Sequence, residues 1–293
     1  MKWILYKLTF HFFLRLPDAI LSFLFTIFHP IYKATHKKRA YGRVEKHLKN
    51  CGFATDSAKK RVSAKDVFKS LYWNGIDSYR LLARMPSAIK RVRYENEDVI
   101  REALAQGPIV ALSIHQGAFE NLHRSLCRYS QHVHLVTNPF KNKALTRILQ
   151  NFRQDSNLHE YSTDEVSTVL RSLFKTKGIL AMVVDQAKDA RGNTVKLFGR
   201  ETTLYLRLPV KANQMGAGIV TFRTFCEMAT DEKGRKIRQH VVRFENYYPP
   251  KTAASDAGEM DLVQGIAREI EGWIKKHPEQ WCWNYHRNFC IEN

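Results

Sequence analysis

The sequence predicts an α/β fold in which a layered, largely parallel sheet is flanked by helices, behind an apolar, membrane-associated N-terminal helical segment. Short apolar runs alternate with helical patterns from about residue 94 onward, which is typical of parallel sheets covered by helices. Of the 293 residues, 44% are hydrophobic, enough to bury a sizeable core. Because we find no internal repeat and no Gly/Ser-rich linker, we expect one domain over residues 41–293, after a separate segment of residues 1–40.

The N-terminal segment is the most apolar part of the chain. An uncharged run extends from Ala19 to Tyr32, but Arg15 and Asp18 interrupt the apolar residues before it. A helix that crosses a bilayer needs about 20 apolar residues in sequence. Three interpretations stay open: a tilted and poorly apolar span, helices that lie in the membrane interface, or a buried pair of core helices. No small-residue cleavage site follows, which argues against a removed signal peptide.

The positive charge is concentrated directly behind this apolar segment. The chain carries 47 Lys and Arg against 28 Asp and Glu, a formal net charge of +19. Residues 33–93 alone hold 17 basic and four acidic side chains, a net charge of +13. Such a surplus predicts an anionic partner, whether nucleic acid, an acidic membrane surface, or an acidic substrate or carrier. Its position beside an apolar anchor favours anionic headgroups on the cytoplasmic side of a membrane.

The remaining elements follow in order along the chain. Ile109–Ile114 is a continuous apolar run, as in a strand buried on both faces. In the final helix Leu262, Ile266 and Ile270 form an apolar stripe, and Pro278 ends the pattern. The expected strands cover residues 109–114, 133–136, 179–184, 218–227 and 239–246. The expected helices cover residues 64–85, 121–129, 164–177 and 259–276.

Several classes of site have no sequence support. The five cysteines are widely spaced and form no CxxC pair, which argues against a disulfide framework or a zinc knuckle and indicates a reducing compartment. We also find no HExxH, no Cys/His cluster and no Gly-rich phosphate fingerprint. The sequence therefore predicts neither a metal nor a cofactor.

The sharpest candidate site is His115-Gln-Gly-Ala-Phe-Glu120, directly after the strand at 109–114. The carboxyl ends of strands in open α/β sheets are where ligand sites form. A histidine can take a proton from an attacking hydroxyl, and a nearby carboxylate can fix its tautomer. Residues five apart do not share a helix face, so the chain must turn between the two, and Gly117 permits that turn. From the residues alone, a structural histidine beside a solvated glutamate is an equally good interpretation.

The same segment carries a family resemblance. His115-x4-Glu120 after an apolar strand resembles the His-x4-Asp/Glu motif of the glycerolipid acyltransferase superfamily, and its Glu form is similar to the bacterial lipid A biosynthesis (lauroyl/myristoyl) acyltransferase family. Further segments resemble that family in the same order: Asn138-Pro-Phe with Arg153, Asp185-Gln186, Val195-Lys-Leu-Phe-Gly-Arg200, Met215-Gly-Ala-Gly-Ile-Val220 and His277-Pro-Glu-Gln-Trp-Cys-Trp283. The chain departs from the family at Leu197, where the family has Phe, and in the residues after Trp283.

The resemblance implies a glycerolipid-acyltransferase-like fold and a membrane-bound acyltransferase at the cytoplasmic face of a bacterial inner membrane. It would move a fatty acyl chain from acyl carrier protein or acyl-CoA to a glycolipid hydroxyl, in a late step of lipid A biosynthesis. His115 would be the general base, and Glu120 would orient it and support it electrostatically. A Gly-x-Ser-x-Gly nucleophile turn is absent, which favours direct transfer over a covalent acyl-enzyme.

The other matching residues are expected to serve substrate binding. Arg153 is a candidate donor to the tetrahedral oxyanion or an anchor for acceptor phosphate. Asp185 and Gln186 either position the site or belong to loop structure, and Arg200 would meet phosphate. We keep three alternatives: another phospholipid or glycolipid acceptor, a thioesterase-like or catalytically silent paralogue, and a basic nucleic-acid-binding protein. The last lacks any recognised nucleic-acid module.

Overall fold

The computed structural model describes residues 11–54, 61–137, 143–186, 192–251 and 256–285. The α-helices are α2 (Asp18–His36), α3 (Gly42–Asn50), α4 (Ala64–Leu82), α5 (Pro86–Ile89), α6 (Glu97–Gln106), α7 (Leu122–Leu126), α8 (Lys143–Arg153), α9 (Val166–Thr176), α10 (Arg207–Gln214) and α11 (Asp256–Lys276). The strands are β1 (Val92–Glu95), β2 (Ile109–Ser113), β3 (Val133–Thr137), β4 (Leu158–Ser162), β5 (Ile179–Val183), β6 (Asn193–Leu197), β7 (Arg200–Leu204), β8 (Gly218–Thr230) and β9 (Lys236–Tyr248). A π-helical turn spans Lys37–Tyr41, and 3-10 turns span Phe119–Asn121, Pro278–Gln280 and Trp283–Tyr285.

Seven strands form one sheet in the order β1-β9-β8-β2-β5-β3-β4, while β6 and β7 pair separately as a hairpin. Every neighbouring pair in the large sheet is parallel except β8 and β9. The predicted α/β class and the largely parallel sheet are therefore confirmed. The two strands at the centre, β2 and β5, run in register from Ile109 opposite Ile179 to Ser113 opposite Val183.

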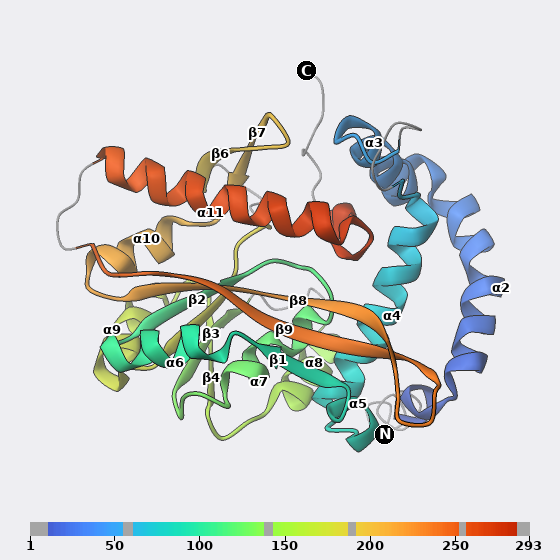
Figure 1. Ribbon diagram of the computed structural model, residues 1–293, viewed down its shortest axis with the longest axis horizontal. Coiled ribbons are helices and arrows are strands. Elements are labelled where there is room, and N and C mark those ends of the chain that lie inside the picture. The colour runs from blue at the N-terminus through green and yellow to red at the C-terminus, as the bar shows by residue number, and fades with distance from the viewer. Residues whose placement is uncertain (1–10, 55–60, 138–142, 187–191, 252–255, 286–293) are drawn as a thin grey trace.

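Helices cover both faces of the sheet, as Figure 1 shows. On one face, Ile266 and Ile270 of α11 pack with Val110 and Leu180 in the main core cluster. On the other face, α6 and α7 cover a second cluster around Ala111. The central strands are thus buried on both sides, which explains why their sequences read as continuous apolar runs rather than alternating ones.

Two expected helices end earlier in the structure than the sequence pattern indicated. The helix expected over 64–85 ends at Leu82, and Arg84 follows with a φ of 55°. The helix expected over 121–129 is the short α7, which ends at Leu126. There the amide of Cys127 donates to the carbonyl oxygens of His123 and Arg124 and closes the last turn. The predicted strands 218–227 and 239–246 are longer, because β8 and β9 form one continuous antiparallel pair.

The N-terminal helix α2 lies beside α4 at one end of the sheet (Figure 1). Its inner side is buried: Leu21 packs with Trp73 and Ile76, and the hydroxyl of Tyr72 donates to the Leu21 carbonyl at 2.9 Å. Its outer side is exposed and apolar, with Phe23 at 63% exposure. Within the described residues, no helix combines the length and the hydropathy needed to cross a membrane. Leu21 and Phe23 thus show that α2 is buried on the side facing α4 and exposed on the other.

Candidate active site

His115 and Asp185 follow the two central strands of the sheet. His115 comes two residues after the end of β2, and Asp185 comes two residues after the end of β5. Because β2 and β5 are parallel neighbours, their carboxyl ends lie side by side and bring together two residues that are 70 positions apart. This is the edge of an open α/β sheet where ligand sites form.

A buried hydrogen-bond network fixes the His115 ring. Nδ1 of His115 lies 2.7 Å from Oδ1 of Asp185. The backbone N–H of His115 also donates to both carboxylate oxygens at 3.1 Å. The indole Nε1–H of Trp281 donates to Oδ2 of Asp185 at 2.7 Å. An anionic Asp185 accepts the proton on Nδ1, which leaves Nε2 as the basic nitrogen. Nε2 makes no hydrogen bond to any residue in the described ranges.

The environment of His115 raises its pKa above the ordinary value. Burial disfavours the imidazolium, but the charge of Asp185, its hydrogen bond and the more distant charge of Glu120 together outweigh burial. A carboxylate next to histidine stabilises the protonated ring. The ring is therefore suited to accept a proton and to hold it while a reaction proceeds.

Glu120 makes no hydrogen bond with the His115 ring in the described residues and instead pairs with Arg153. Oε2 of Glu120 lies 2.5 Å from Nη2 of Arg153. The family resemblance implied that Glu120 orients His115, but the hydrogen bond that orients the ring comes from Asp185. The physical reason is the strand order, which brings Asp185 to Nδ1, while the turn after Gly117 carries Glu120 toward α8. Glu120 acts on His115 through its charge alone.

The loop that carries His115 is held in a tight conformation. Gly117 has a φ of 59°, and a Cβ there would lie 2.6 Å from the carbonyl oxygen of Thr224. The expectation that Gly117 permits the turn is therefore confirmed. The hydroxyl of Thr224 donates to the carbonyl of Gln116 at 2.8 Å, which ties the loop to β8. The positive φ of Gly117 is a backbone conformation that strongly favours glycine.

The segment 280–282 near the C-terminus pairs with the same loop. Gln116 and Trp281 form an antiparallel bridge, and the amide of Cys282 donates to the carbonyl of His115 at 3.0 Å. The side chain of Gln280 bonds both backbone groups of Cys226, at 2.7 and 2.8 Å. This pairing anchors Trp281 against Asp185. The segment belongs to the family resemblance, but Trp281 was not predicted as a site residue.

An apolar cavity of about 540 Å³ opens beside His115. Phe119 and Tyr285, which line it, also contact the His115 ring edge-on at centroid distances of 4.8 and 5.2 Å. Glu120 lines the cavity as well. The opposite walls come from α2 and α4, including Phe25, Phe28, Leu71 and Tyr72. The loop that carries His115 thus borders an apolar cavity whose other walls come from α2 and α4.

Two other predicted site residues, Gln186 and Arg200, do not line the apolar cavity. Gln186 directly follows Asp185 but is exposed. Arg200 begins β7 in the separate hairpin and lines neither cavity at the site. The Asn138-Pro139-Phe140 motif lies outside the described residues, as do residues 1–10 and the chain after Tyr285. Phe119 and Tyr285 were not predicted, since single aromatic residues carry no signal that separates a site from a core.

A family model described as bacterial lipid A biosynthesis acyltransferase matches residues 2–289. No curated protein matches the chain. One similar solved structure is the crystal structure of the 1-acyl-sn-glycerophosphate (LPA) acyltransferase, PlsC, from Thermotoga maritima. It has 9% sequence identity and a TM-score of 0.41, and the match covers 88% of this chain and 97% of that chain.

Proposed function

Since this chain belongs to the bacterial lipid A biosynthesis acyltransferase family, we propose that it moves a fatty acyl chain from an acyl thioester to a hydroxyl of a lipid A precursor, with His115 as the general base. The observation that carries this assignment is the ring of His115, held at Nδ1 by the buried Asp185 and left without a described partner at Nε2, beside an apolar cavity. Membership in the family predicts acyl transfer. The donor and the roles of individual residues are our proposal.

The chemistry follows from the tautomer of His115. Nε2 takes the proton of the acceptor hydroxyl as its oxygen attacks the thioester carbonyl. A C–O bond forms and gives a tetrahedral oxyanion, which collapses as the C–S bond breaks. The imidazolium then returns its proton to the leaving thiolate, so the products are an ester and a thiol. Asp185 stabilises the imidazolium between the two proton transfers, and its hydrogen bonds keep the ring from rotating.

Glu120 and Arg153 support this step from the rim of the site. The charge of Glu120 adds to that of Asp185 in stabilising protonated His115. Arg153 holds Glu120 in place through the 2.5 Å contact. Arg153 is therefore better suited to positioning Glu120 than to direct anchoring of a phosphate, because one of its terminal nitrogens is already bound to a carboxylate.

The apolar cavity is the natural site for the acyl chain. It is lined by side chains from α2, α4 and the loop after β2, and it reaches Glu120. Alkyl chains gain free energy when they leave water for such a surface, at about 0.8 kcal/mol for each buried CH₂ group. An acyl chain in this space would bring its thioester carbonyl to the catalytic loop.

The outer face of α2 supports contact with the cytoplasmic face of a bacterial inner membrane. Phe23, Ile27 and Ile31 are 45–63% exposed on that face. Basic residues follow directly in Lys33 and the turn Lys37–Tyr41. An apolar stripe next to a basic block suits a helix in the interface, with the block against anionic headgroups. In this proposal residues 1–40 serve as the membrane contact and residues 41–293 as the acyltransferase domain.

The basic block also suits the donor, because acyl carrier protein is acidic. Arg43, Lys46 and Lys49 lie on α3, and Arg43 donates to the carbonyl of Asn284 at 3.2 Å. Asn284 and Tyr285 line the apolar cavity. A carrier docked on α3 would therefore present its thioester close to the cavity. Acyl-CoA, the other donor, carries phosphates that the same cations would attract.

A transfer assay with purified protein tests the proposal. The protein is incubated with an acyl-carrier-protein thioester, with and without a lipid A precursor, and products are followed by mass spectrometry. We expect the precursor to gain the mass of one acyl chain. Release of free fatty acid at a rate that the precursor does not change would instead indicate a thioesterase. A duplex affinity that falls steeply with salt, without binding to vesicles, would indicate a nucleic-acid-binding protein.

A further inference from the structure

A second, polar cavity meets the apolar cavity at the pair of Glu120 and Arg153. Glu120 lines the apolar cavity, whereas Arg153 lines a polar one of about 690 Å³. The two side chains are in contact at 2.5 Å. A molecule that reaches His115 from the polar side would therefore approach an acyl chain held on the apolar side. This arrangement suits a two-substrate transfer.

The lining of the polar cavity carries no surplus of positive charge. Its two arginines, Arg84 and Arg153, are matched by two carboxylates, Asp155 and Glu160. Arg84 is also bound to Asp155 at 3.1 Å, and Arg153 is bound to Glu120. A phosphate in this cavity would meet carboxylates on the same wall and cations that are already paired. Charge matching thus disfavours an anionic ligand here.

The walls nevertheless present many hydrogen-bonding groups of both kinds. Oε2 of Glu160 and Nε of Arg153 are buried and have no hydrogen-bond partner among the described residues. Gln150 and Gln154 also line the cavity, and within the described ranges their side-chain amides make no hydrogen bond. Burial raises the pKa of Glu160, so its carboxylate would gain from a donor. Sugar hydroxyls both donate and accept, which matches this mixed set.

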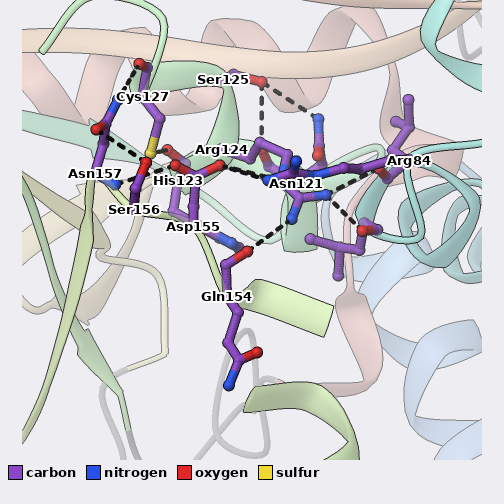
Figure 2. A network of polar contacts seen from close by, with 12 residues as sticks. Arg84, Asn121, His123, Arg124, Ser125, Cys127, Gln154, Asp155, Ser156 and Asn157 are labelled. Carbon is purple, nitrogen blue, oxygen red and sulfur yellow. Dashed lines mark hydrogen bonds and ion pairs between the residues drawn. The ribbon is translucent and has the colours of Figure 1, made fainter. Parts of the chain in front are cut away.

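Hydrogen bonds hold the backbone at the floor of the cavity. Figure 2 shows the network beneath it, in which Arg124 joins α4 to the loop after α8. Arg124 donates to the carbonyl oxygens of Phe152 and Gln154, at 3.1 and 3.4 Å, and Asp155 accepts from the amide of Asn157 at 3.1 Å. The Gln154 side chain points away from this network in Figure 2. The backbone of Gln154 is therefore held by a hydrogen bond, while its side-chain amide is available to a ligand.

We infer that this cavity binds an uncharged sugar ring of the acceptor, next to the hydroxyl that is acylated, and that the acceptor phosphates are bound elsewhere. The inference rests on the proposed acyl transfer and adds the site of the acceptor headgroup. Glu160 would accept from sugar hydroxyls, and Gln150 and Gln154 would both donate and accept. This assignment replaces the expectation that Arg153 anchors a phosphate.

Steady-state kinetics with two acceptors test the inference. The probes are an acylated glucosamine disaccharide with its phosphates and the same lipid without them. The variants are Gln154→Ala and Glu160→Gln, and the control is Gln131→Ala, an exposed glutamine two residues before β3 that does not line the cavity. Each variant loses one or two hydrogen bonds, so we expect KM for the acceptor to rise roughly three- to tenfold. KM for the acyl thioester should stay the same, and Gln131→Ala should match the wild type.

The two acceptors distinguish the possible outcomes. A sugar site predicts the same rise in KM for both lipids. A rise that vanishes for the lipid without phosphates would show a phosphate site and overturn the inference, as would variants with unchanged acceptor KM. Gln154 is exposed, so Gln154→Ala keeps the test valid if Glu160→Gln fails to fold. A wild-type protein that acylates neither lipid would overturn the proposed function itself.

Discussion

The contact between Trp281 and Asp185 allows the catalytic network to be tested without touching either candidate catalytic residue. Trp281→Phe removes the indole N–H that donates to Oδ2 of Asp185 at 2.7 Å. A hydrogen bond to a charged group contributes about 1.5–3 kcal/mol. If that stabilisation is lost from the transition state, kcat falls roughly 10- to 150-fold, because each 1.36 kcal/mol is a factor of ten.

Trp283→Phe is the matched control. Trp283 is equally buried, and its ring meets that of Trp281 edge-on at 4.6 Å. Its Nε1–H donates to the carbonyl of Pro278 at 2.6 Å, so the network around His115 is not involved. Both variants lose the same ring volume and should lose similar thermal stability. We therefore expect similar Tm values for the two variants and a large loss of kcat only for Trp281→Phe.

The pH dependence of kcat provides a second readout of the same network. Without the Trp281 donor, the Asp185 carboxylate is no longer held against Nδ1 of His115, so protonated His115 loses stabilisation and the pKa of His115 falls. The acid limb of the pH profile should then move to lower pH in Trp281→Phe and stay in place in Trp283→Phe. Equal kcat values and equal pH profiles in the two variants would refute the role of Trp281.

Three further predictions follow from the geometry. The pKa of His115 is raised, since Asp185 and Glu120 outweigh burial, so kcat/KM should fall with decreasing pH from above 6.5. Glu120→Gln should move this acid limb of the pH profile to lower pH. An unchanged acid limb would count against a charge effect of Glu120. Gly117→Ala places a Cβ 2.6 Å from the Thr224 carbonyl oxygen at a positive φ and should lower both Tm and the rate of acyl transfer. Gly52→Ala, at a positive φ with open space around it, should leave acyl transfer intact. Equal transfer rates of the two glycine variants would contradict the account. Phe23→Ser should weaken flotation of the protein with anionic vesicles without lowering Tm. Met228→Ser, at an equally exposed apolar residue on β8, should leave flotation unchanged. Unchanged flotation of Phe23→Ser would contradict membrane contact through α2.

The strands and the edge that carries the site were predictable from the sequence. Ile109–Ile114 and the run at 179–184 read as buried strands because both faces of the sheet are covered. A parallel sheet places the residues after both runs at one edge. Local patterning is enough for this, since it depends only on which positions are apolar. His115 was named from its place after the first run, and Asp185 was named from the family resemblance.

The partner of His115 was not predictable in the same way. The motif put Glu120 beside His115 in sequence, whereas the contact with Asp185 depends on β5 being the neighbour of β2. No local pattern encodes that strand order. Trp281 is 1% exposed. Its hydrogen bond to Asp185 depends on the pairing of residues 115–117 with 280–282, which joins distant segments.

The most direct test of the central claim is the rate of acyl transfer by His115→Gln. Glutamine is similar in size and can still bond Asp185, but it cannot take a proton from a hydroxyl. General-base catalysis contributes about 10²- to 10⁴-fold, so transfer from an acyl-carrier-protein thioester to a lipid A precursor should fall by at least about 100-fold while Tm stays close to that of the wild type. Transfer at the wild-type rate by folded His115→Gln would contradict the assignment of His115 as the general base.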